Sequence, residues 1–430
     1  MVFYGGGPTS GDLMDDVIGS IHHVPASWLR NSDLAPLIDA YRRGLVEERY
    51  SDETARVHLC CVAHFARWAR RRRLPVLDLA DVDIQHFLNE HLPKCTCPRP
   101  VRRSHRQLRA ALRRLLAWLE QAGILSSCLR APDVVEDELR QFDIHMQHSK
   151  GLAQNTRVQR LNVLRPFLRQ TCSSNLDGVT IPAPQDMRQF IKQQLERWSP
   201  SSAHVLTSAL RSYLRFRAAC GDQVEHLMPV VASPANWRLA PLPQTLSPEE
   251  VTRLLAAPAP ELPYTLRDYA MVRCVVDLGL RASEVVNLGL DDIDWVAGTL
   301  RVGPNKSRRV DLMPLPQATG SAIAKYLHSE RPETANRRVF VRHVAPIDRP
   351  VGPGAVGHAI RKAYLRCGMT QTRVHVLRHT LASRLLEAGA TLKEVADVLR
   401  HRALDTSLIY AKVDVNRLSA VALPWPGSVA

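Results

Sequence analysis

The chain has 430 residues and a mass of 48.2 kDa, which is enough for roughly two to four domains. Hydrophobic residues make up 45% and charged residues 23% of it, which excludes a disordered or fibrous protein. Lysine and arginine number 57 against 42 aspartates and glutamates, leaving a net charge of +15. A charge of this size favours a polyanionic partner, most simply nucleic acid.

Neither membrane insertion nor secretion is expected. No stretch approaches the ~18 uninterrupted apolar residues of a membrane span. The first residues, MVFYGGGPTSGDLMDD, lack the basic and apolar regions of a secretory signal. The 9 cysteines, an odd number scattered through a large chain, indicate reduced thiols and a cytoplasmic location.

Three apolar segments recur in the same order along the first half of the chain, at offsets of 102, 103 and 98 residues. The matched segments are 54–65 with 156–167, 83–88 with 186–191, and 108–123 with 206–221. The recurrence at helical spacing predicts two similar all-helical modules, residues 31–128 and 129–228, after an N-terminal extension of residues 1–30. Chance similarity between amphipathic helices is the alternative.

A proline-rich stretch separates these modules from the rest of the chain. Several prolines fall within residues 229–246, so this segment is predicted to be an extended linker. Ser247 and Glu250 then form a capping box at the start of a helix. Residues 299–302 and 310–313 are predicted to be short strands in an otherwise helical region. The expected fold class is therefore mainly α, with a small antiparallel β-sheet in the C-terminal domain.

Six residues suited to phosphoryl transfer follow one another in the C-terminal region: Arg281, Lys306, His375, Arg378, His401 and Tyr410. His375 and Arg378 are three residues apart and therefore lie on one face of a helix. His379 points about 100° away from Arg378 on that helix, so a structural role is expected for it. Each residue taken alone has an ordinary structural explanation, and only the ordered set is informative.

In this order and spacing the six residues resemble the catalytic set of the tyrosine recombinase (phage integrase) family, over about residues 245–430. The resemblance implies a catalytic domain, residues 247–412, preceded by a core-binding helical domain, and a tail, residues 413–430, that contacts another subunit. The closing segment Leu423–Gly427 resembles that of recombinases from bacterial mobile elements. Arg400 departs from the family pattern, in which Gly commonly precedes the second histidine.

The resemblance also implies roles in cutting DNA. Arg281 and Arg378 would bind non-bridging oxygens of the scissile phosphate, because guanidinium forks match them and keep their charge. Tyr410 would be the nucleophile and form a 3′-phosphotyrosine. His375 would accept its proton and His401 would donate a hydrogen bond to the phosphate.

Lys306 would protonate the departing 5′-oxygen as general acid. The phosphotyrosine conserves the energy of the broken bond, so no cofactor, ATP or metal is implied. The implied partners are double-stranded DNA with a specific recombination site and further subunits in a tetrameric complex, identical or related. The implied location is the bacterial cytoplasm, on the nucleoid when bound. The alternatives are a topoisomerase-like enzyme and a non-catalytic DNA-binding accessory protein.

Arginines are concentrated in the first helical module. Those expected to bind DNA are Arg70, Arg71, Arg102, Arg106, Arg109, Arg113, Arg157 and Arg308. Arg102, Arg106, Arg109 and Arg113 fall on one predicted helical stripe, which suits a phosphate backbone. Such contacts supply affinity more than sequence recognition.

A Cys-x-Cys motif, Cys95 and Cys97, lies close to His91 in the first module. His105 could complete a set of four zinc ligands. A second Cys/His pair at finger-like spacing is missing from the sequence, so two reduced cysteines in a loop are the favoured interpretation. No metal site is predicted.

Overall fold

The computed structural model describes residues 21–125, 133–171, 179–198, 200–232, 243–256, 265–303, 310–370, 373–401 and 408–411. The chain divides into two compact units, of which one is residues 128–241 and the other combines residues 1–127 with 242–430. Separate hydrophobic cores lie within residues 21–119, 139–231, 246–377 and 382–410. The two helical modules and the C-terminal region thus each bury apolar surface of their own.

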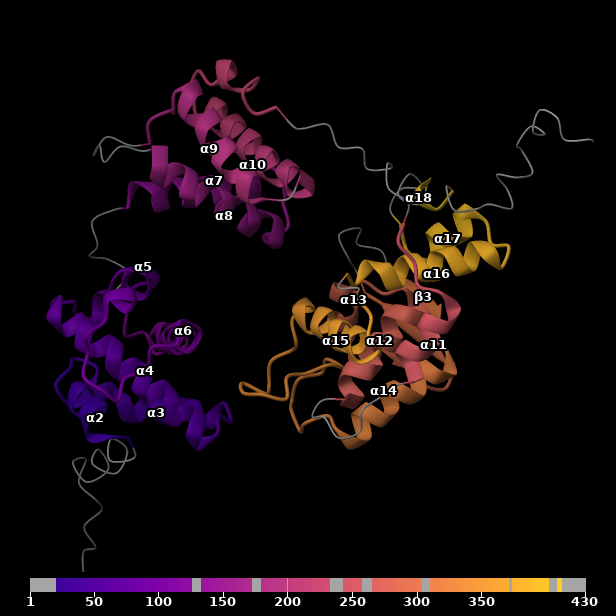
Figure 1. Ribbon diagram of the computed structural model, residues 1–430, viewed down its shortest axis with the longest axis horizontal. Helices are drawn as coiled ribbons and strands as arrows, with labels where there is room; N and C mark the ends of the chain where they lie inside the picture. Colours follow the sequence, from indigo (N-terminus) through magenta and orange to yellow (C-terminus); the bar gives the residue numbers. More distant parts are fainter. Residues whose placement is uncertain are drawn as a thin grey trace, which may run out of the picture. The chain divides into compact units, whose positions relative to one another are not determined.

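The first helical module consists of helices α2 to α6 (Figure 1). Their bounds are His23–Arg30 (α2), Ile38–Glu47 (α3), Asp52–Arg71 (α4), Asp81–His86 (α5) and His105–Gln121 (α6). α4 packs between α2 and α6 and buries Phe65 against this core. Trp28 and Leu29 of α2 are buried in the same core. The module therefore begins before the expected boundary at residue 31, because the apolar face of α2 needs this core.

The second helical module consists of helices α7 to α10 (Figure 1). Their bounds are Val134–His148 (α7), Gln154–Thr171 (α8), Pro184–Arg197 (α9) and Pro200–Ala219 (α10). Its core extends as far as Val231, which is fully buried. The expected linker therefore begins a few residues later than residue 229, and residues 233–242 of it lie outside the described residues.

The two modules bury equivalent positions on equivalent helices. α3 to α6 of the first follow the same order as α7 to α10 of the second. The matched pairs that are buried in both modules include Phe65 and Phe167, Phe87 and Phe190, Leu108 and Leu206, Ala111 and Ala209, and Leu112 and Leu210. Agreement in helix order and in core aromatics goes beyond shared amphipathic spacing, so the geometry supports a duplicated scaffold.

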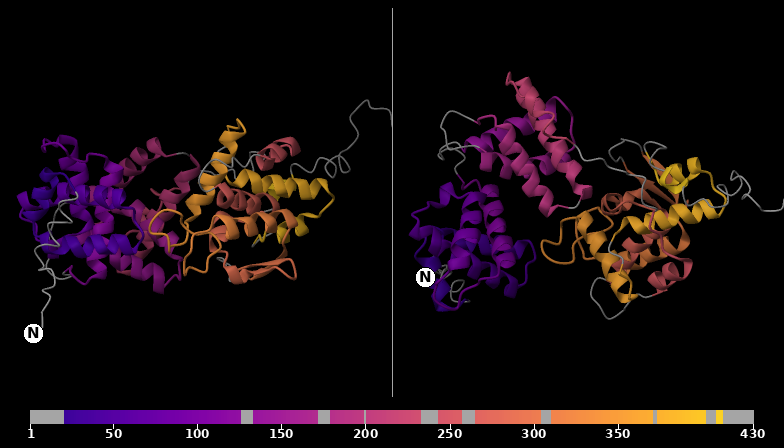
Figure 2. Two further views of the ribbon diagram at one scale, coloured as in Figure 1. Left: turned by 90° about the horizontal axis from the view of Figure 1, so that it is seen from below. Right: turned by 45° about the horizontal axis from the view of Figure 1, so that its top comes forward.

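The C-terminal region is mostly helical (Figure 2). Its helices are Pro248–Ala256 (α11), Thr265–Leu278 (α12), Ala282–Asn287 (α13), Gln317–Ser329 (α14), Pro353–Arg366 (α15), His375–Glu387 (α16), Leu392–Val398 (α17) and Leu408–Ala411 (α18). α12 is apolar on most sides, which is typical of a central helix, and it packs against α14, α15 and α16. Among the described helices, none is both long and apolar enough to cross a membrane.

A three-stranded antiparallel sheet lies beside these helices, in the order β1-β2-β3. Its strands are Ile293–Asp294 (β1), Thr299–Val302 (β2) and Asp311–Pro314 (β3). Buried Leu300 of β2 lies opposite both Ile293 and Met313, so one face of the sheet joins the core. The predicted fold class is confirmed. The strand β1 was not predicted, because its two residues are too few to show the alternation of apolar and polar residues that marks a strand.

Candidate active site

A left-handed turn between α12 and α13 carries the first arginine into the site. Gly279 has φ +59°, and a Cβ there would lie 2.7 Å from Leu399 and 2.9 Å from Leu381, so glycine is required. Arg281 follows as the N-cap of α13. Its backbone N–H donates to Glu284 Oε2 at 2.8 Å, and its guanidinium donates to Oε1 at 2.7 Å.

Glu284 is a buried carboxylate that holds two guanidiniums. Besides Arg281 it accepts a hydrogen bond from Arg400 at 2.7 Å. Burial raises the pKa of Glu284, but Arg400 and Arg281 together bring it below its usual value, so the side chain is ionised. The predicted pairing of Glu284 with an arginine is confirmed, and it fixes the direction of the Arg281 fork.

Arg378 lies on α16 and is only 5% exposed. Its guanidinium donates to the carbonyl oxygens of Gly279 and Leu399, so its orientation is fixed by backbone on either side. Burial and the neighbouring cations Arg281 and Arg400 lower its pKa. Two or more guanidiniums this close together create a strong positive potential, which favours binding of an anion.

Arg400 occupies a backbone conformation that glycine normally supplies. Its φ is +54°, in the left-handed region. This explains why glycine is the common residue before the second histidine, and why arginine here is a strained substitute. The Arg400 guanidinium compensates by pairing with Glu284 and by donating to Val398 O at 3.0 Å.

Tyr410 lies on α18 with its side chain in a small core of α16 and α17 residues. It is 1% exposed, and its hydroxyl lies 2.9 Å from His379 Nδ1. Its ring is parallel to that of His401, with centroids 6.3 Å apart. Burial raises the pKa of Tyr410, while Arg378 and Arg281 oppose this rise. The phenol is thus neutral at rest, but close enough to two cations for its anion to be stabilised.

The structural role expected for His379 stays a prediction, but its side chain contacts Tyr410, which the sequence did not indicate. Helical geometry does point it away from Arg378, but α18 approaches α16 from that side and brings Tyr410 against it. Only long-range packing creates this contact, so periodicity within α16 could not reveal it. The adjacency of His379 to the His-x-x-Arg motif was the one available signal.

His375 and His401 both lie close to the guanidiniums. Burial, followed by Arg378 and Arg281, lowers the pKa of His375. The same causes lower the pKa of His401 to about 4. Both rings are therefore neutral near pH 7 and can donate a hydrogen bond from one nitrogen to a bound anion.

Known proteins resemble this chain in sequence. Residues 244–417 match the phage integrase family. The integrase/recombinase y4rA of Sinorhizobium fredii is 35% identical over 399 residues, which is 92% of this chain and 95% of that protein. Tyrosine recombinase XerD of Lacticaseibacillus casei is 31% identical over 65% of this chain and 95% of its own length. The chain belongs to the phage integrase family.

A solved structure agrees with this assignment at the level of fold. The XerH site-specific recombinase bound to palindromic difH substrate covers 71% of this chain and 92% of its own, with 17% identity and a TM-score of 0.50. The fold that the order of the six residues predicted is therefore the fold of this integrase.

Five of the six predicted catalytic residues of the integrase lie among the described residues, and these five come together at one site. Lys306 and Arg308 belong to the connection between β2 and β3, at residues 304–309, and lie outside the described residues. The predicted subunit-contacting tail, residues 413–430, also lies outside them. These three predictions stay predictions.

The arginines predicted to bind DNA differ in their surroundings. Arg106, Arg109 and Arg113 are exposed and share one face of α6, while Arg70 and Arg71 are exposed at the end of α4. The predicted stripe is shorter at one end, because Ser104 caps α6 by accepting from Gln107 N at 3.4 Å. Arg102 consequently lies in the preceding loop.

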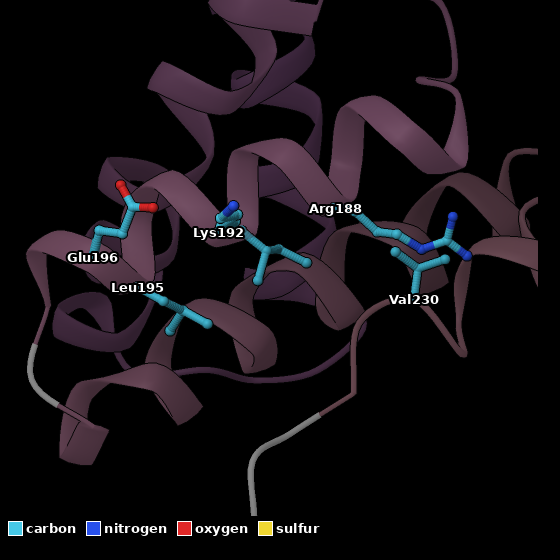
Figure 3. Close-up of a pocket in the computed structure, with 6 residues that line it drawn as sticks. Arg188, Lys192, Leu195, Glu196 and Val230 are labelled. Carbon is cyan, nitrogen blue, oxygen red and sulfur yellow. The ribbon is translucent and has the colours of Figure 1, made fainter.

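Arg157 of the second module is less available to DNA than predicted. Its Nε lies 3.2 Å from Asp143 Oδ1 within the module, and the side chain is 15% exposed. A shallow pocket of about 440 Å³, formed mainly by α9, is lined by charged and apolar side chains (Figure 3). Arg188 and Glu196 lie toward opposite ends of it, with Lys192 and Leu195 between them (Figure 3). Its open shape and mixed lining point to no defined small ligand.

Proposed function

We propose that this integrase is a site-specific DNA recombinase of a mobile element, which cuts and rejoins double-stranded DNA through Tyr410. The observation that carries the proposal is the buried Tyr410 hydroxyl, which is hydrogen-bonded to a neutral histidine and lies close to two guanidiniums. The names of the relatives, integrase/recombinase and tyrosine recombinase, support it.

The first step activates the nucleophile. The Tyr410 hydroxyl lies 2.9 Å from His379 Nδ1, and in the tautomer of His379 with its hydrogen on Nε2 the hydroxyl donates to the lone pair of Nδ1. Attack of the Tyr410 oxygen on phosphorus transfers that proton to His379. His379 therefore replaces His375 as the proposed proton acceptor, and His375 joins His401 as a hydrogen-bond donor to the phosphate.

The negative charge that develops on the phosphate during this attack must also be stabilised. The five-coordinate phosphorane carries extra negative charge on its equatorial oxygens, which Arg281 and Arg378 are placed to bind. Arg281 is the more accessible of the two, with a side chain 36% exposed, so a phosphate can reach it from solvent. The Arg378 guanidinium is oriented by the backbone carbonyls of Gly279 and Leu399, so it needs little reorganisation to bind the phosphate.

The last step is the release of the 5′-oxygen, which needs a proton. We assign this proton to Lys306, on the basis of family resemblance. The phosphorus–oxygen bond to Tyr410 forms as that to the 5′-oxygen breaks, and a 5′-hydroxyl from a second strand reverses the process. The charges balance without a metal or ATP.

The helical modules would hold the DNA. The exposed arginines of α6 and α4 suit the phosphate backbone, and a specific recombination site would be read elsewhere on the modules. Rejoining four strands requires four subunits, so a tetramer, assisted by the 413–430 tail, is part of the proposal. Such a protein acts in the cytoplasm.

The deciding experiment traps the covalent intermediate. Full-length protein is incubated with plasmid carrying the DNA that flanks its gene, and adducts are counted after denaturation. We expect an adduct at a 3′-phosphate that Tyr410→Phe abolishes and Tyr269→Phe retains. An adduct formed by Tyr410→Phe would overturn the proposal. Relaxation of plasmid without the flanking DNA would favour a topoisomerase instead.

A further inference from the structure

A second cluster of reactive side chains lies in the first helical module, away from the six-residue set. Four ligand-capable atoms converge there, from His64, His91, Cys95 and Cys97, all within 4.8 Å of one another. His64 Nε2 lies 3.2 Å from His91 Nε2 and 3.3 Å from Cys95 Sγ. Cys97 Sγ lies 3.7 Å from His91 Nε2. His105, the fourth candidate from the sequence, is exposed as the first residue of α6, and His64 takes its place.

The backbone brings these atoms together by three different means. His64 projects from the buried face of α4. His91 ends a π-helical turn, Phe87–His91, a local widening of the helix that often marks a functional site. A 3-10 turn follows, and the chain is then extended at Cys95 (φ −66°, ψ 120°), so Cys95 and Cys97 point to the same side.

The histidines are oriented as metal-binding histidines are. His64 Nδ1 lies 3.0 Å from the carbonyl oxygen of Arg102, to which only an N–H can donate. The lone pair of His64 is therefore on Nε2, which faces His91 and Cys95. A ring nitrogen anchored on backbone while the other faces its ligand set is the usual outer-shell arrangement of metal sites.

The cluster is sheltered from solvent. His64 is 0% exposed, Cys95 is 9% and Cys97 is 6%, while His91 is half-buried at the edge of the cluster. Phe87 stacks on His91 with centroids 5.3 Å apart and contacts His64 edge-on at 4.9 Å. Lone pairs and thiols that face one another in a largely buried cluster are stabilised by a cation between them.

The second module serves as an internal reference that lacks the cluster. Pro166 and Gln194 occupy the positions equivalent to His64 and His91. Only residues 198–199 join α9 to α10, whereas residues 92–104 join the π-helical turn to α6. The four ligand atoms thus accompany an insertion that has little core of its own and gains from being fastened.

We propose that His64, His91, Cys95 and Cys97 bind one structural Zn²⁺ ion in a closed tetrahedral site. Tetrahedral zinc with Zn–N of about 2.0 Å and Zn–S of about 2.3 Å places its ligand atoms roughly 3.3–3.8 Å apart, close to the three separations given above. Two thiolates balance the charge of Zn²⁺, and the two thiol protons leave to solvent.

The site fastens the loop that leads into the arginine face. Arg102 is bound through its carbonyl to a zinc ligand, and α6 begins three residues later. Loss of zinc would free residues 92–104 and loosen the start of α6. The proposal is independent of the chemistry at Tyr410.

Metal analysis of the full-length protein is the first test. Protein purified without chelator should contain about one zinc per chain, and Cys95→Ser or Cys97→Ser should reduce this at least fivefold. Cys220→Ser removes an exposed cysteine of the second module and should leave the zinc content unchanged. Zinc content below about a tenth per chain after incubation with Zn²⁺, or the same content in all variants, would overturn the proposal.

A second test uses only the unmodified protein, so misfolding of a variant cannot obscure it. Alkylation followed by peptide mass spectrometry should find Cys95 and Cys97 protected with zinc bound and reactive after chelation, while Cys220 reacts in both. Replacement by Co²⁺ should give the absorption of a tetrahedral thiolate site. Equal reactivity with and without chelator, or a Cys95–Cys97 disulfide in freshly purified protein, would count against zinc.

Discussion

The histidines of the first module and those of the C-terminal region lie in different surroundings. In the first module the histidines face the thiols of Cys95 and Cys97. In the C-terminal region they lie among the guanidiniums of Arg281, Arg378 and Arg400. Thiolates complement a cation and guanidiniums complement an anion, so the same residue type serves opposite ligands. The neighbours, more than the histidines, specify the chemistry.

The two clusters are also assembled differently. Three ligands of the first are close in sequence, with His91 just before the insertion and Cys95 and Cys97 within it, and α4 supplies the fourth. The second joins residues more than a hundred positions apart, through two left-handed positions, Gly279 and Arg400. Its groups are fixed by backbone carbonyls and by Glu284. Substitutions in the His/Cys cluster should therefore affect structure, whereas substitutions around Tyr410 should affect the chemical reaction.

The largest effect is expected at the guanidinium that faces solvent. Arg281→Ala removes charge that stabilises the phosphorane, while Arg400 still pairs with Glu284. Covalent adduct formation at saturating DNA should fall by at least about a thousandfold. Arg384→Ala, on the exposed side of α16, is the matched control and should cleave normally. A loss at Arg281 below about tenfold would contradict the anion-binding assignment.

His379→Ala should come next, with cleavage slowed by about a hundredfold. Burial, together with His375 and Arg378, lowers the pKa of His379, which keeps the ring neutral and able to accept a proton at neutral pH. In the unmodified protein, cleavage should decline as pH falls through this lowered pKa. The acid limb should disappear in His379→Ala and remain in His358→Ala, which changes an exposed histidine. An acid limb that moves instead with His375→Ala would restore His375 as the acceptor.

The sequence was most informative where a local pattern determines structure. Helical spacing and Ser247 with Glu250 predicted the modules and the start of α11, where Glu250 N donates to Ser247 Oγ at 3.2 Å. The ordered catalytic set was visible because six residue types suited to one chemistry follow one another in a fixed order and spacing.

Contacts between distant segments were not visible in the sequence. Neither the hydrogen bond between Tyr410 and His379 nor the approach of His64 to the Cys-x-Cys motif follows from the spacing of residues along one helix or strand. The short strand β1 forms only because β2 lies beside it. These features depend on tertiary packing, which local propensity does not encode.

The arginine face should affect binding rather than chemistry. Replacing Arg106, Arg109 and Arg113 with Ala should reduce the salt dependence of DNA binding by up to about 0.9 in slope per lost phosphate contact. Adduct formation at saturating DNA should persist. Arg157→Ala in the second module is the control, because Asp143 already occupies that guanidinium. Unchanged binding of the triple variant at every salt concentration would show that this face does not meet DNA.

A smaller effect, on stability, should distinguish two contributions of Arg400: the strain of its left-handed backbone and its bond to Glu284. Both Arg400→Ala and Arg400→Gly lose the bond to Glu284, but only glycine adopts φ +54° without strain. The free energy of unfolding, measured by denaturant titration, should therefore be about 1 kcal/mol higher for Arg400→Gly than for Arg400→Ala. The unmodified protein should be more stable than either, since a charge-assisted bond contributes about 1.5–3 kcal/mol. Equal stability of the two variants would remove backbone strain from the explanation.

The smallest effect concerns the pH dependence of stability. Burial, with Arg378 next, lowers the pKa of His401 to about 4, against about 6.5 when unfolded. Between these values the unfolded chain binds a proton that the folded chain does not, so stability falls as pH decreases from about 6.5 to about 4. His401→Gln should make the melting temperature of the C-terminal region less dependent on pH in this window. Exposed His328→Gln should leave the dependence unchanged, and a slope that His401→Gln does not alter would mean that the folded site accepts the proton.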